Sequence, residues 1–592
     1  MCHRFLPLGL LFLLHGPAIT SAQRVVYVNS QAVGANDGTS WTNAFSDLQD
    51  ALDDARNNDG CPCEIWITAG IYKPDRGTGD RGIAFEPPGN VSLYGGFAGF
   101  EECLDDRDWV KKETILSGDL RGDDDLNATG QSNCCGVTLQ PGCEDAECAA
   151  IVYTRRPQCA QVWDSTCALM ARDFCCEVCR TTLCDNSDAV LRLVEVSGSV
   201  MLNRLTVRGG NDFGLVSNRS DIIVDECTFA GNPGIGIVTF YGSASILRSC
   251  FSDNGLFDSY SSGGGVLNES NQAVVSDCEF LRNRGGGLGA ESSAPIRRCT
   301  FRDNIGTALT IGEGYPTISD CVFLGNHAGD GAAVYSAFLS APRIEDCVFL
   351  GNHAAAWGGA IYSNSGGGLT VVNSLFVGNS AGNGGAVLNQ SGIVRMFNCT
   401  ISGNFAETGG GIESGGGMQL TNSVVWGNHD QYGYLQSSQV YSLDPPTLRY
   451  NIVQGWSGSL GGVGNGGADP LFVDPSGPDS IQGTDDDDLR LLPGSPAINA
   501  GDPNPSGLPS TDLDGHARVL CDRVDIGAYE FGIGDYNCDQ NVDLSDFANW
   551  SACMTGPHSG PYGTGCESFD FNADHSIDLL DFAALQPILS GQ

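Results

Sequence analysis

A six-residue motif recurs nine times between residues 227 and 428. Each copy has a small residue, an apolar residue two positions later, and an asparagine three positions after that. The asparagines that end the nine copies are Asn232, Asn254, Asn283, Asn304, Asn326, Asn352, Asn379, Asn404 and Asn428. They span 428 − 232 = 196 residues over eight intervals, an average of 24.5 residues per repeat. A unit of this length cannot bury its apolar side alone, so successive units are expected to stack.

The small and apolar positions lie two residues apart and therefore share one face of a strand. The apolar position is phenylalanine in seven copies, followed by Ile401 and Val425. Stacking would place like residues about 4.8 Å apart, with phenylalanine in the core and asparagine amides hydrogen-bonded along the stack. Serine replaces cysteine at the small position, and stacked side chains run parallel. These cysteines are therefore expected to be free, buried thiols.

Glycine-rich segments follow the asparagines, as in GGAIY (358–362) and GGAVL (384–388). Paired glycines allow a tight bend, and the apolar residues after them form the next strand. A third short strand, such as RIED (343–346), leads back to the cysteine. The sequence thus predicts an all-β solenoid with about three strands per turn.

These paired motifs resemble the repeats of polymorphic outer-membrane proteins and of the wider pectin-lyase-like superfamily, over residues 23–126 and 189–531. The resemblance implies a right-handed parallel β-helix. Residues 26–52 are similar to the start of secreted bacterial β-helix proteins, and a helix with Leu48, Ala51, Leu52 and Ala55 on its apolar face would cap the coil. Residues 468–531 look like the usual closing segment, which we expect to cover the end of the solenoid.

The N-terminus predicts export. Residues 1–22 have a basic start, a short apolar run and a small-residue cleavage site, as in a secretory signal peptide. That run is too short to span a bilayer, so we expect a secreted or cell-surface protein without a membrane span. The formal net charge of −41 opposes binding to nucleic acid.

Residues 127–188 interrupt the solenoid pattern with a dense group of cysteines. The ten are Cys134, Cys135, Cys143, Cys148, Cys159, Cys167, Cys175, Cys176, Cys179 and Cys184. In an exported chain, such an even-numbered group indicates an inserted disulfide module. A zinc site is the alternative, because Cys176 and Cys179 have CxxC spacing, but neither a second CxxC pair nor a histidine accompanies them.

Residues 533–592 contain two twelve-residue segments, at 535–546 and 570–581, with oxygen-bearing side chains at positions 1, 3, 5, 9 and 12. This spacing wraps a hard cation in oxygen ligands, as in EF-hand loops, and predicts Ca²⁺ as the bound cation. The predicted ligands are Asp535, Asn537, Asp539, Asn541, Asp543 and Asp546, then Asp570, Asn572, Asp574, Ser576, Asp578 and Asp581. Asn541 and Ser576 would ligate through their backbone carbonyls, and Asp543 and Asp578 directly or through water.

Two such loops, each followed by a short helix, resemble a type I dockerin. The resemblance implies a small α-helical calcium-binding domain that docks on a cohesin-like partner. The chain departs from the family in its long linker with Cys553 and Cys566, and in Leu544-Ser545 and Leu579-Leu580, where a Ser-Thr pair is common. A calcium-stabilised domain without a dedicated partner is the alternative.

The residue before each cysteine is expected to point outward and to form a column. Its members Asp277, Arg298, Asp320 and Asp346 are the candidate catalytic residues, since an arginine between carboxylates suits β-elimination and a carboxylate pair suits glycoside hydrolysis. A solvated ladder of alternating charges is the simpler reading. The aromatic residues Tyr335, Trp357, Tyr362 and Trp426 form a second candidate, a sugar-stacking strip.

The leading hypothesis is a secreted protein that binds or degrades polysaccharide and carries a calcium-dependent docking tail. As an enzyme it would be a polysaccharide lyase or a glycoside hydrolase. The alternative is a non-catalytic surface or adhesion protein in which the β-helix is a rigid scaffold. Fold resemblance alone cannot decide between these functions.

Overall fold

The computed structural model describes residues 24–58, 63–120, 188–255, 264–269, 272–505, 507–521, 523–556, 562–563 and 566–590. The predicted signal peptide and, except for residue 188, the cysteine-rich insert lie outside the described residues. The chain divides into two compact units, Met1–Tyr260 with Gly264–Val274 and Ser261–Gly263 with Val275–Gln592.

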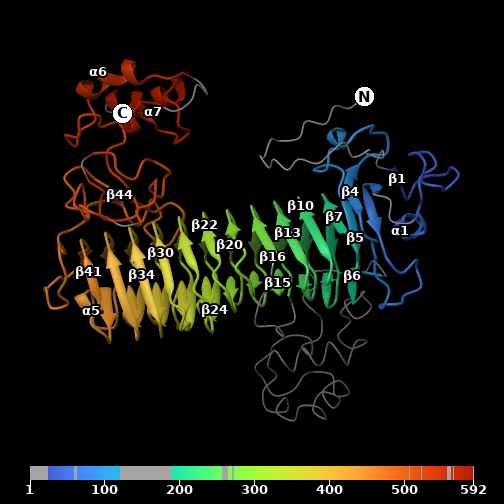
Figure 1. Cartoon of the computed structure of the whole chain (residues 1–592), viewed down its shortest axis with the longest axis horizontal. Coiled ribbons are helices and arrows are strands. Elements are labelled where there is room, and N and C mark those ends of the chain that lie inside the picture. The colour runs from blue at the N-terminus through green and yellow to red at the C-terminus, as the bar shows by residue number, and fades with distance from the viewer. Residues whose placement is uncertain are drawn as a thin grey trace, which may run out of the picture. The chain divides into compact units, whose positions relative to one another are not determined.

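The first unit consists of three sheets in which the described strands pair in parallel (Figure 1). One sheet has the order β1 (Arg24–Val28), β2 (Cys63–Thr68), β4 (Val91–Phe97), β7 (Ser199–Asn203), β10 (Asp221–Asp225) and β13 (Ser243–Leu247). The others are β3 (Gly70–Tyr72), β5 (Thr114–Ser117), β8 (Thr206–Arg208), β11 (Thr228–Ala230) and β14 (Cys250–Ser252), and β6 (Ala189–Val194), β9 (Phe213–Asn218), β12 (Ile235–Phe240) and β15 (Val266–Glu269). Strand β16 (Gln272–Ser276) spans the boundary between the units in sequence.

The helix predicted near the N-terminus is present as α1 (Leu48–Asn57). Its N-cap Asp47 accepts a hydrogen bond from the backbone N–H of Gln49, and Leu48, Ala51, Leu52 and Ala55 are buried as predicted. A single 3-10 turn, Leu104–Asp106, lies between β4 and β5.

The second unit repeats the three-strand turn in sheets that we call A, B and C. Sheet A is β19 (Ile296–Arg297), β22 (Thr317–Ser319), β26 (Arg343–Glu345), β30 (Leu369–Val372), β34 (Ile393–Phe397), β38 (Gly417–Thr421) and β41 (Thr447–Arg449). Sheet B is β17 (Glu279–Leu281), β20 (Thr300–Arg302), β23 (Val322–Leu324), β27 (Val348–Leu350), β31 (Leu375–Val377), β35 (Thr400–Ser402), β39 (Val424–Trp426) and β42 (Ile452–Val453). Sheet C is β18 (Leu288–Ala290), β21 (Leu309–Ile311), β25 (Val334–Ser336), β29 (Ile361–Ser363), β33 (Val387–Asn389), β37 (Ile412–Ser414) and β40 (Val440–Ser442).

Four turns of this unit contain an additional strand between sheets B and C. Together these strands form sheet D, with the order β24 (His327–Asp330), β28 (His353–Trp357), β32 (Ser380–Asn383) and β36 (Phe405–Thr408). The prediction of three strands per turn is therefore confirmed, with a fourth strand where the glycine-rich loop is long enough to pair with its neighbours.

The residue before each cysteine position is the bend between sheets A and B. Asp277, Arg298, Asp320 and Asp346 have φ of 58°, 48°, 55° and 54°. These values are left-handed, a conformation that asparagine and aspartate adopt more readily than other non-glycine residues. Asp277, Arg298 and Asp320 are exposed, so the prediction that this residue points outward is confirmed for them. They do so from the bend and not from a strand, because the strand begins only after the cysteine position.

Buried asparagines form a continuous hydrogen-bonded ladder from Asn283 to Asn428 in the second unit. Asn352 shows the pattern. Its Nδ2 donates to Asn379 Oδ1 (2.9 Å) and to the carbonyl of Phe323 (3.0 Å), while its Oδ1 accepts from the backbone N–H and from Nδ2 of Asn326. The predicted ladder is confirmed, and it satisfies amides that would otherwise be costly to bury.

The phenylalanine column stacks with the repeat of the strands. Phe280, Phe301, Phe323, Phe349 and Phe376 have successive ring centroids 4.5 to 4.8 Å apart and planes within 5°. All five side chains are fully buried. The predicted core column is therefore confirmed.

The side chains at the cysteine position form a second hydrogen-bonded ladder and do not merely fill the core. Cys347 Sγ donates to the carbonyl of Glu345 two residues earlier (3.2 Å), and Ser374 Oγ donates to the carbonyl of Val372 in the same way (2.8 Å). The backbone N–H of Cys347 in turn donates to Ser374 Oγ (3.2 Å). Serine replaces cysteine because both side chains close the A–B bend. Cys227, Cys299, Cys321, Cys347 and Cys399 are free and buried, as predicted.

The closing segment lies along the outer face of sheet B rather than only across the end of the coil. Leu489 of β44 (Asp488–Leu491) packs with Leu350, Leu375 and Val377, whose side chains flank the buried phenylalanines. Strand β44 pairs antiparallel with β43 (Phe472–Asp474). The segment covers sheet B because strands β23, β27, β31 and β39 have apolar residues on both faces (VFL, VFL, LFV and VVW), whereas the earlier strand β20 reads TFR.

The remaining helices belong to the C-terminal part of the second unit. The short helix α5 (Gln436–Gln439) precedes β40, and the 3-10 turn η5 (Glu567–Phe569) lies between α6 (Leu544–Cys553) and α7 (Leu579–Ser590). Trp550, Phe569, Ile577 and Leu585 form a separate small core between the last two helices. No helix in the described parts of the chain is long and apolar enough to cross a bilayer.

Replacing Asn352 by alanine should destabilise the second unit by about 3 kcal/mol, since it leaves the backbone N–H of Asn326 without an acceptor and removes one of the two hydrogen bonds donated by Asn326 Nδ2. The midpoint of urea-induced unfolding would measure this loss. Asn364→Ala, at an exposed asparagine, is the control and should change stability by less than about 0.5 kcal/mol. Equal effects of the two substitutions would contradict the structural role of the ladder.

Candidate functional site

The four predicted catalytic residues occupy successive A–B bends but do not form one convergent group. Arg298 donates from Nε and Nη2 to the two carboxylate oxygens of Asp277, at 2.6 and 2.8 Å. Arg298 Nη2 also donates to Ser276 Oγ (3.0 Å). The Asp277 carboxylate raises the pKa of the Arg298 guanidinium above its ordinary value. The two side chains thus neutralise each other.

The other end of this column is in contact with the closing segment. Asn373 Nδ2 donates to Asp346 Oδ1 (2.5 Å) and to the carbonyl of Thr511 (3.2 Å). Burial raises the pKa of Asp346, and the charge of Asp320 raises it further. At one end of the column the charges neutralise each other in an ion pair, and at the other end the residues contact the closing segment. This arrangement favours a structural ladder over a catalytic centre.

Three of the four predicted strip aromatics meet on the outer face of sheets C and D. Tyr335 and Tyr362 occupy the same register on β25 and β29, and their rings stack 5.3 Å apart at 11°. Trp357, at the end of β28, lies 5.4 Å from Tyr362 and is 41% exposed. Trp426 lies elsewhere and packs against the core beneath the closing segment, so its assignment to the strip is wrong. We call Tyr335, Trp357 and Tyr362 the aromatic strip.

Hydrogen-bonding groups continue the strip in both directions along the coil. Tyr362 is buried and donates its hydroxyl to Gln390 Oε1 (2.5 Å), and burial raises its pKa to about 12. On the sheet D side, Asp330 is in register with Trp357. Two turns later, Thr408 Oγ1 accepts from Asn383 (2.5 Å) and donates to Glu413 Oε2 (2.8 Å). Rings, carboxylates and amides therefore share one face.

The first predicted calcium loop is organised by two buried carboxylates. Asp535 accepts hydrogen bonds from the backbone N–H groups of Asp539 (3.1 Å) and Gln540 (2.7 Å). Asp546 accepts from the N–H groups of Asn537 (3.0 Å) and Asp543 (2.8 Å). The first and last positions thus hold the loop closed, with their oxygens inside it.

The second loop repeats these bonds 35 residues later (570 − 535 and 581 − 546). Asp570 accepts from the N–H groups of Asp574 (3.1 Å) and His575 (3.0 Å). Asp581 accepts from the N–H groups of Asn572 (3.3 Å) and Asp578 (2.9 Å). Two independent stretches of sequence therefore adopt the same loop.

The remaining predicted ligands line the same loops. Asn541 and Ser576 donate their backbone N–H groups to Asp539 and Asp574, at 2.9 and 2.8 Å. Asp543 and Asp578 accept from the N–H groups of Ser545 and Leu580 at the starts of α6 and α7, at 2.7 and 2.8 Å. The helices begin at Leu544 and Leu579, inside the twelve-residue segments rather than after them, because these two aspartates cap them.

The charge of residues 533–592 fits a bound cation. This segment contains nine carboxylates and neither lysine nor arginine. Burial raises the pKa of Asp535 and of Asp570, and the charges of Asp546 and of Asp581, respectively, raise them further. A hard cation ligated by oxygen is the group that these residues fit.

Two disulfides stabilise this region. The pair Cys553–Cys566, considered from the sequence, is present at the end of α6. The pair Cys521–Cys538 was missed, and it joins the closing segment to the fourth position of the first loop. The available signal was that both cysteines fall outside the repeat positions and outside the cysteine-rich insert.

Both loops contact the closing segment at their first halves. Gly494 N–H donates to Gln540 Oε1 of the first loop (3.1 Å). The second loop approaches through Phe571, whose carbonyl lies 3.5 Å from His516 Nε2, and through Ala573, next to Gly515. The calcium-loop region is therefore fastened to the closing segment by a disulfide and by contacts from each loop.

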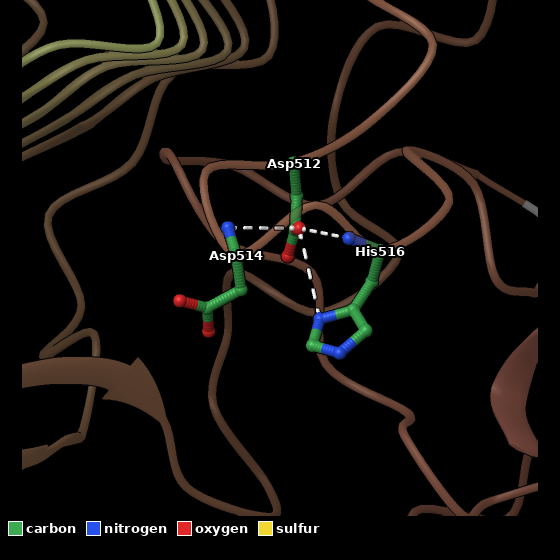
Figure 2. A group of neighbouring side chains, drawn as sticks. All are labelled: Asp512, Asp514 and His516. Atoms are coloured by element: carbon green, nitrogen blue, oxygen red, sulfur yellow. Dashed lines mark hydrogen bonds and ion pairs between the residues drawn. The ribbon is translucent and has the colours of Figure 1, made fainter. Parts of the chain in front are cut away.

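Asp512, Asp514 and His516 form the one cluster among the described residues with three potential metal-ligand side chains in close reach. Figure 2 shows that Asp512 Oδ1 is already engaged by the backbone N–H groups of Asp514 (3.1 Å) and His516 (2.8 Å), while the Asp514 carboxylate points away from it. This arrangement closes a tight turn, and it does not aim the three side chains at a common point.

Behind that turn lies a buried charged group. Arg518 is 2% exposed, donates to the carbonyl of Ala528 (3.0 Å), and lies 3.4 Å from Glu530 Oε1. Asp525 accepts from the backbone N–H groups of Asn499 and Phe531, both at 2.6 Å. Burial raises the pKa of Asp525 to about 6 and also raises that of Glu530.

Comparison with known proteins supports the fold. Residues 190–338 and 291–442 match the family model for a right-handed β-helix region. Among solved structures, the chain is similar to the crystal structure of pectate lyase Pel9A, with 12% identity, a TM-score of 0.35, and coverage of 86% of this chain and 97% of that one. Comparison with curated proteins gives no match. The region that matches the family model is thus a right-handed parallel β-helix.

The stability of the closing segment should fall as pH rises from about 4, the ordinary carboxyl value, through about 6. The folded form binds more protons than the unfolded form in that range, because the pKa of Asp525 and that of Glu530 are raised on folding. The hydrogen-exchange protection of the Ile526 amide, which donates to the carbonyl of Ala497, would measure this loss of stability. Glu530→Gln keeps an acceptor and should weaken the pH dependence. Protection that increases with pH would contradict this assignment.

Proposed function

We propose that this chain is an exported, calcium-binding β-helix protein that binds polysaccharide through the aromatic strip. The observation that carries the polysaccharide assignment is the stack of Tyr335 and Tyr362 beside exposed Trp357, flanked by hydrogen-bonding side chains. Aromatic faces pack against sugar rings, while amides and carboxylates bind hydroxyl groups. A polymer aligned with the coil axis would pass these groups one turn after another.

Binding accounts for the geometry better than cleavage does. The Arg298 guanidinium is occupied by Asp277, and Asp346 borders the closing segment. Lyase chemistry would need an unoccupied base beside the sugar, and hydrolysis would need a facing pair of carboxylates. The proposal therefore assigns the coil a binding role and assigns these bends a structural one.

The calcium part of the proposal rests on the repeated loop geometry. Asp535, Asp539 and Asp546 would hold one Ca²⁺ with Asn537 and the Asn541 carbonyl, and the equivalent second-loop residues would hold another. When bound, the cation supplies the positive charge that the segment lacks. The backbone hydrogen bonds to the first and last carboxylates already hold both loops in a closed form.

A second role for this region, docking on a cohesin-like partner, is favoured by its exposed apolar residues. Leu544 and Leu579 occupy equivalent positions at the starts of α6 and α7 and are 73% and 76% exposed, with Leu580 67% exposed. Exposed leucines at the same place in both copies indicate a contact surface. We propose that this surface, if it has a partner, binds a cohesin-like domain in the presence of calcium.

The full-length chain should bind two Ca²⁺ ions by calorimetry, and chelator should lower its melting temperature. Calcium at a hundredfold excess over its dissociation constant would add about 2.7 kcal/mol per site. Asp539→Asn should weaken one site, since this carboxylate is exposed and ligates without closing the loop. The matched control is Glu567→Gln, which removes the one carboxylate of this segment outside both loops. Unchanged melting with chelator, together with no calcium uptake, would disprove the assignment.

Trp357→Ala should weaken polysaccharide binding about tenfold, the equivalent of about 1.4 kcal/mol, because it removes the exposed ring of the strip. Affinity electrophoresis against a polysaccharide panel, followed by calorimetry on oligosaccharides, would measure the loss. Tyr241→Ala, at a ring 62% exposed in the first unit, is the control and should bind as the unmodified chain does. Retention of no polysaccharide by the unmodified chain would favour the rigid-scaffold function instead.

A further inference from the structure

We infer that the aromatic strip selects polysaccharides that carry amino groups, with neutral polymers bound more weakly and polyuronates rejected. The inference rests on the proposed polysaccharide function and specifies the chemistry of its ligand. It depends on how charge is divided among the faces of the second unit.

The first segment of sheet C in this unit, at 284–295, contains the exposed Arg284, which lies two turns before His327. The six segments that follow build the outer face of sheets C and D around the strip, at 305–316, 327–341, 353–368, 380–392, 405–416 and 429–443. None of them contains lysine or arginine. Their acidic residues are Glu313, Asp330, Glu407, Glu413 and Asp430. The face thus has carboxylates and histidines but no permanently charged base.

Apart from Arg284, the arginines of the same coil lie on the other side of each turn. Those in strands or bends of sheets A and B are Arg282, Arg297, Arg298, Arg302, Arg343, Arg395 and Arg449. Most of them are paired, as in the contacts of Arg343 with Glu345 (2.7 Å) and of Arg449 with Asp502 (2.8 Å). Cationic side chains are therefore separated from the strip by the folding pattern.

Two carboxylates of the strip face lie where a bound sugar would pass. Asp330 is half-buried in register with Trp357, and burial raises its pKa, opposed by a backbone hydrogen bond from Trp357. Glu413 follows Tyr335 and Tyr362 in the outward column of sheet C and receives only the neutral hydrogen bonds of Thr408 and Asn383. Both carboxylates gain from an approaching cation.

Amino groups on a sugar satisfy both elements of this face. An ammonium group pairs with a carboxylate and is attracted by the faces of tryptophan and tyrosine rings. A uronate would meet carboxylates without a guanidinium or an ammonium to receive it, in a chain of formal net charge −41. Charge complementarity therefore selects among polymers that the rings alone would bind alike.

The test uses the full-length chain and three oligosaccharide probes of equal length. These are trimethylated chitosan oligomers, whose charge does not depend on pH, neutral chitin oligomers and oligogalacturonate. Calorimetry at a single pH compares the three probes with the protein in the same protonation state. We expect affinity to decrease in the order in which the probes are named, and the preference for the first over the second to weaken with added salt.

The variant Asp330→Asn with Glu413→Gln keeps the shape of the strip and removes both charges. It should lose about tenfold in affinity for the cationic probe and little for chitin oligomers. Glu279→Gln with Asp303→Asn removes the same charge from exposed positions of sheet B and its following bend, and it is the matched control. The control should retain the preference.

The outcomes distinguish a failure of the amino-sugar inference from a failure of the proposed polysaccharide binding. If chitin oligomers bind and Trp357→Ala abolishes their binding, while the double variant keeps its preference for the cationic probe, polysaccharide binding stands and the amino-sugar inference is wrong. Tighter binding of oligogalacturonate than of either other probe would also overturn it. If none of the probes binds, the polysaccharide function itself fails for these polymers.

Discussion

The structure depends on the requirement that every buried asparagine of the ladder meets the asparagine of the next turn. A buried amide without partners is costly, and Asn352 uses both its donor and its acceptor on neighbouring turns. A shift of one residue in any turn would leave amides unpaired and would turn a phenylalanine away from the core. The ladder therefore fixes the register, and the thiol and hydroxyl ladder at the A–B bend fixes it a second time.

A fixed register lets each outer face be specialised by single outward residues. The later strands of sheet B present leucine and valine and receive the closing segment. Sheet C presents Tyr335, Tyr362 and Glu413 at equivalent positions and remains open beside Trp357. The same scaffold thus has one face for stability and another for binding, and the six segments around the aromatic strip contain no arginine.

The features that repeat could be predicted from the sequence, and those that depend on contacts distant in sequence could not. The Phe349 and Asn352 columns followed from spacing alone, because a parallel coil superposes like positions. The backbone conformation at Asp277 was misjudged, because period-two alternation does not reveal where a strand gives way to a left-handed bend. Trp426 was assigned to the strip because its outward position was visible, whereas the segment that covers it lies far along the chain.

The calcium loops were recognisable because their ligand positions are local in sequence, whereas their surroundings were not. Nothing near Asp535 indicates that Cys538 pairs with Cys521. This bond adds a second covalent connection between the closing segment and the first loop, parallel to the main chain. Tension applied to a partner held at Leu544 or Leu579 would pass through that sulfur bridge into the closing segment, and from there into the side of sheet B along its length. The C-terminal region would consequently act as a rigid handle on the coil, and pulling on it would load the stacked turns in shear rather than peel them off one at a time.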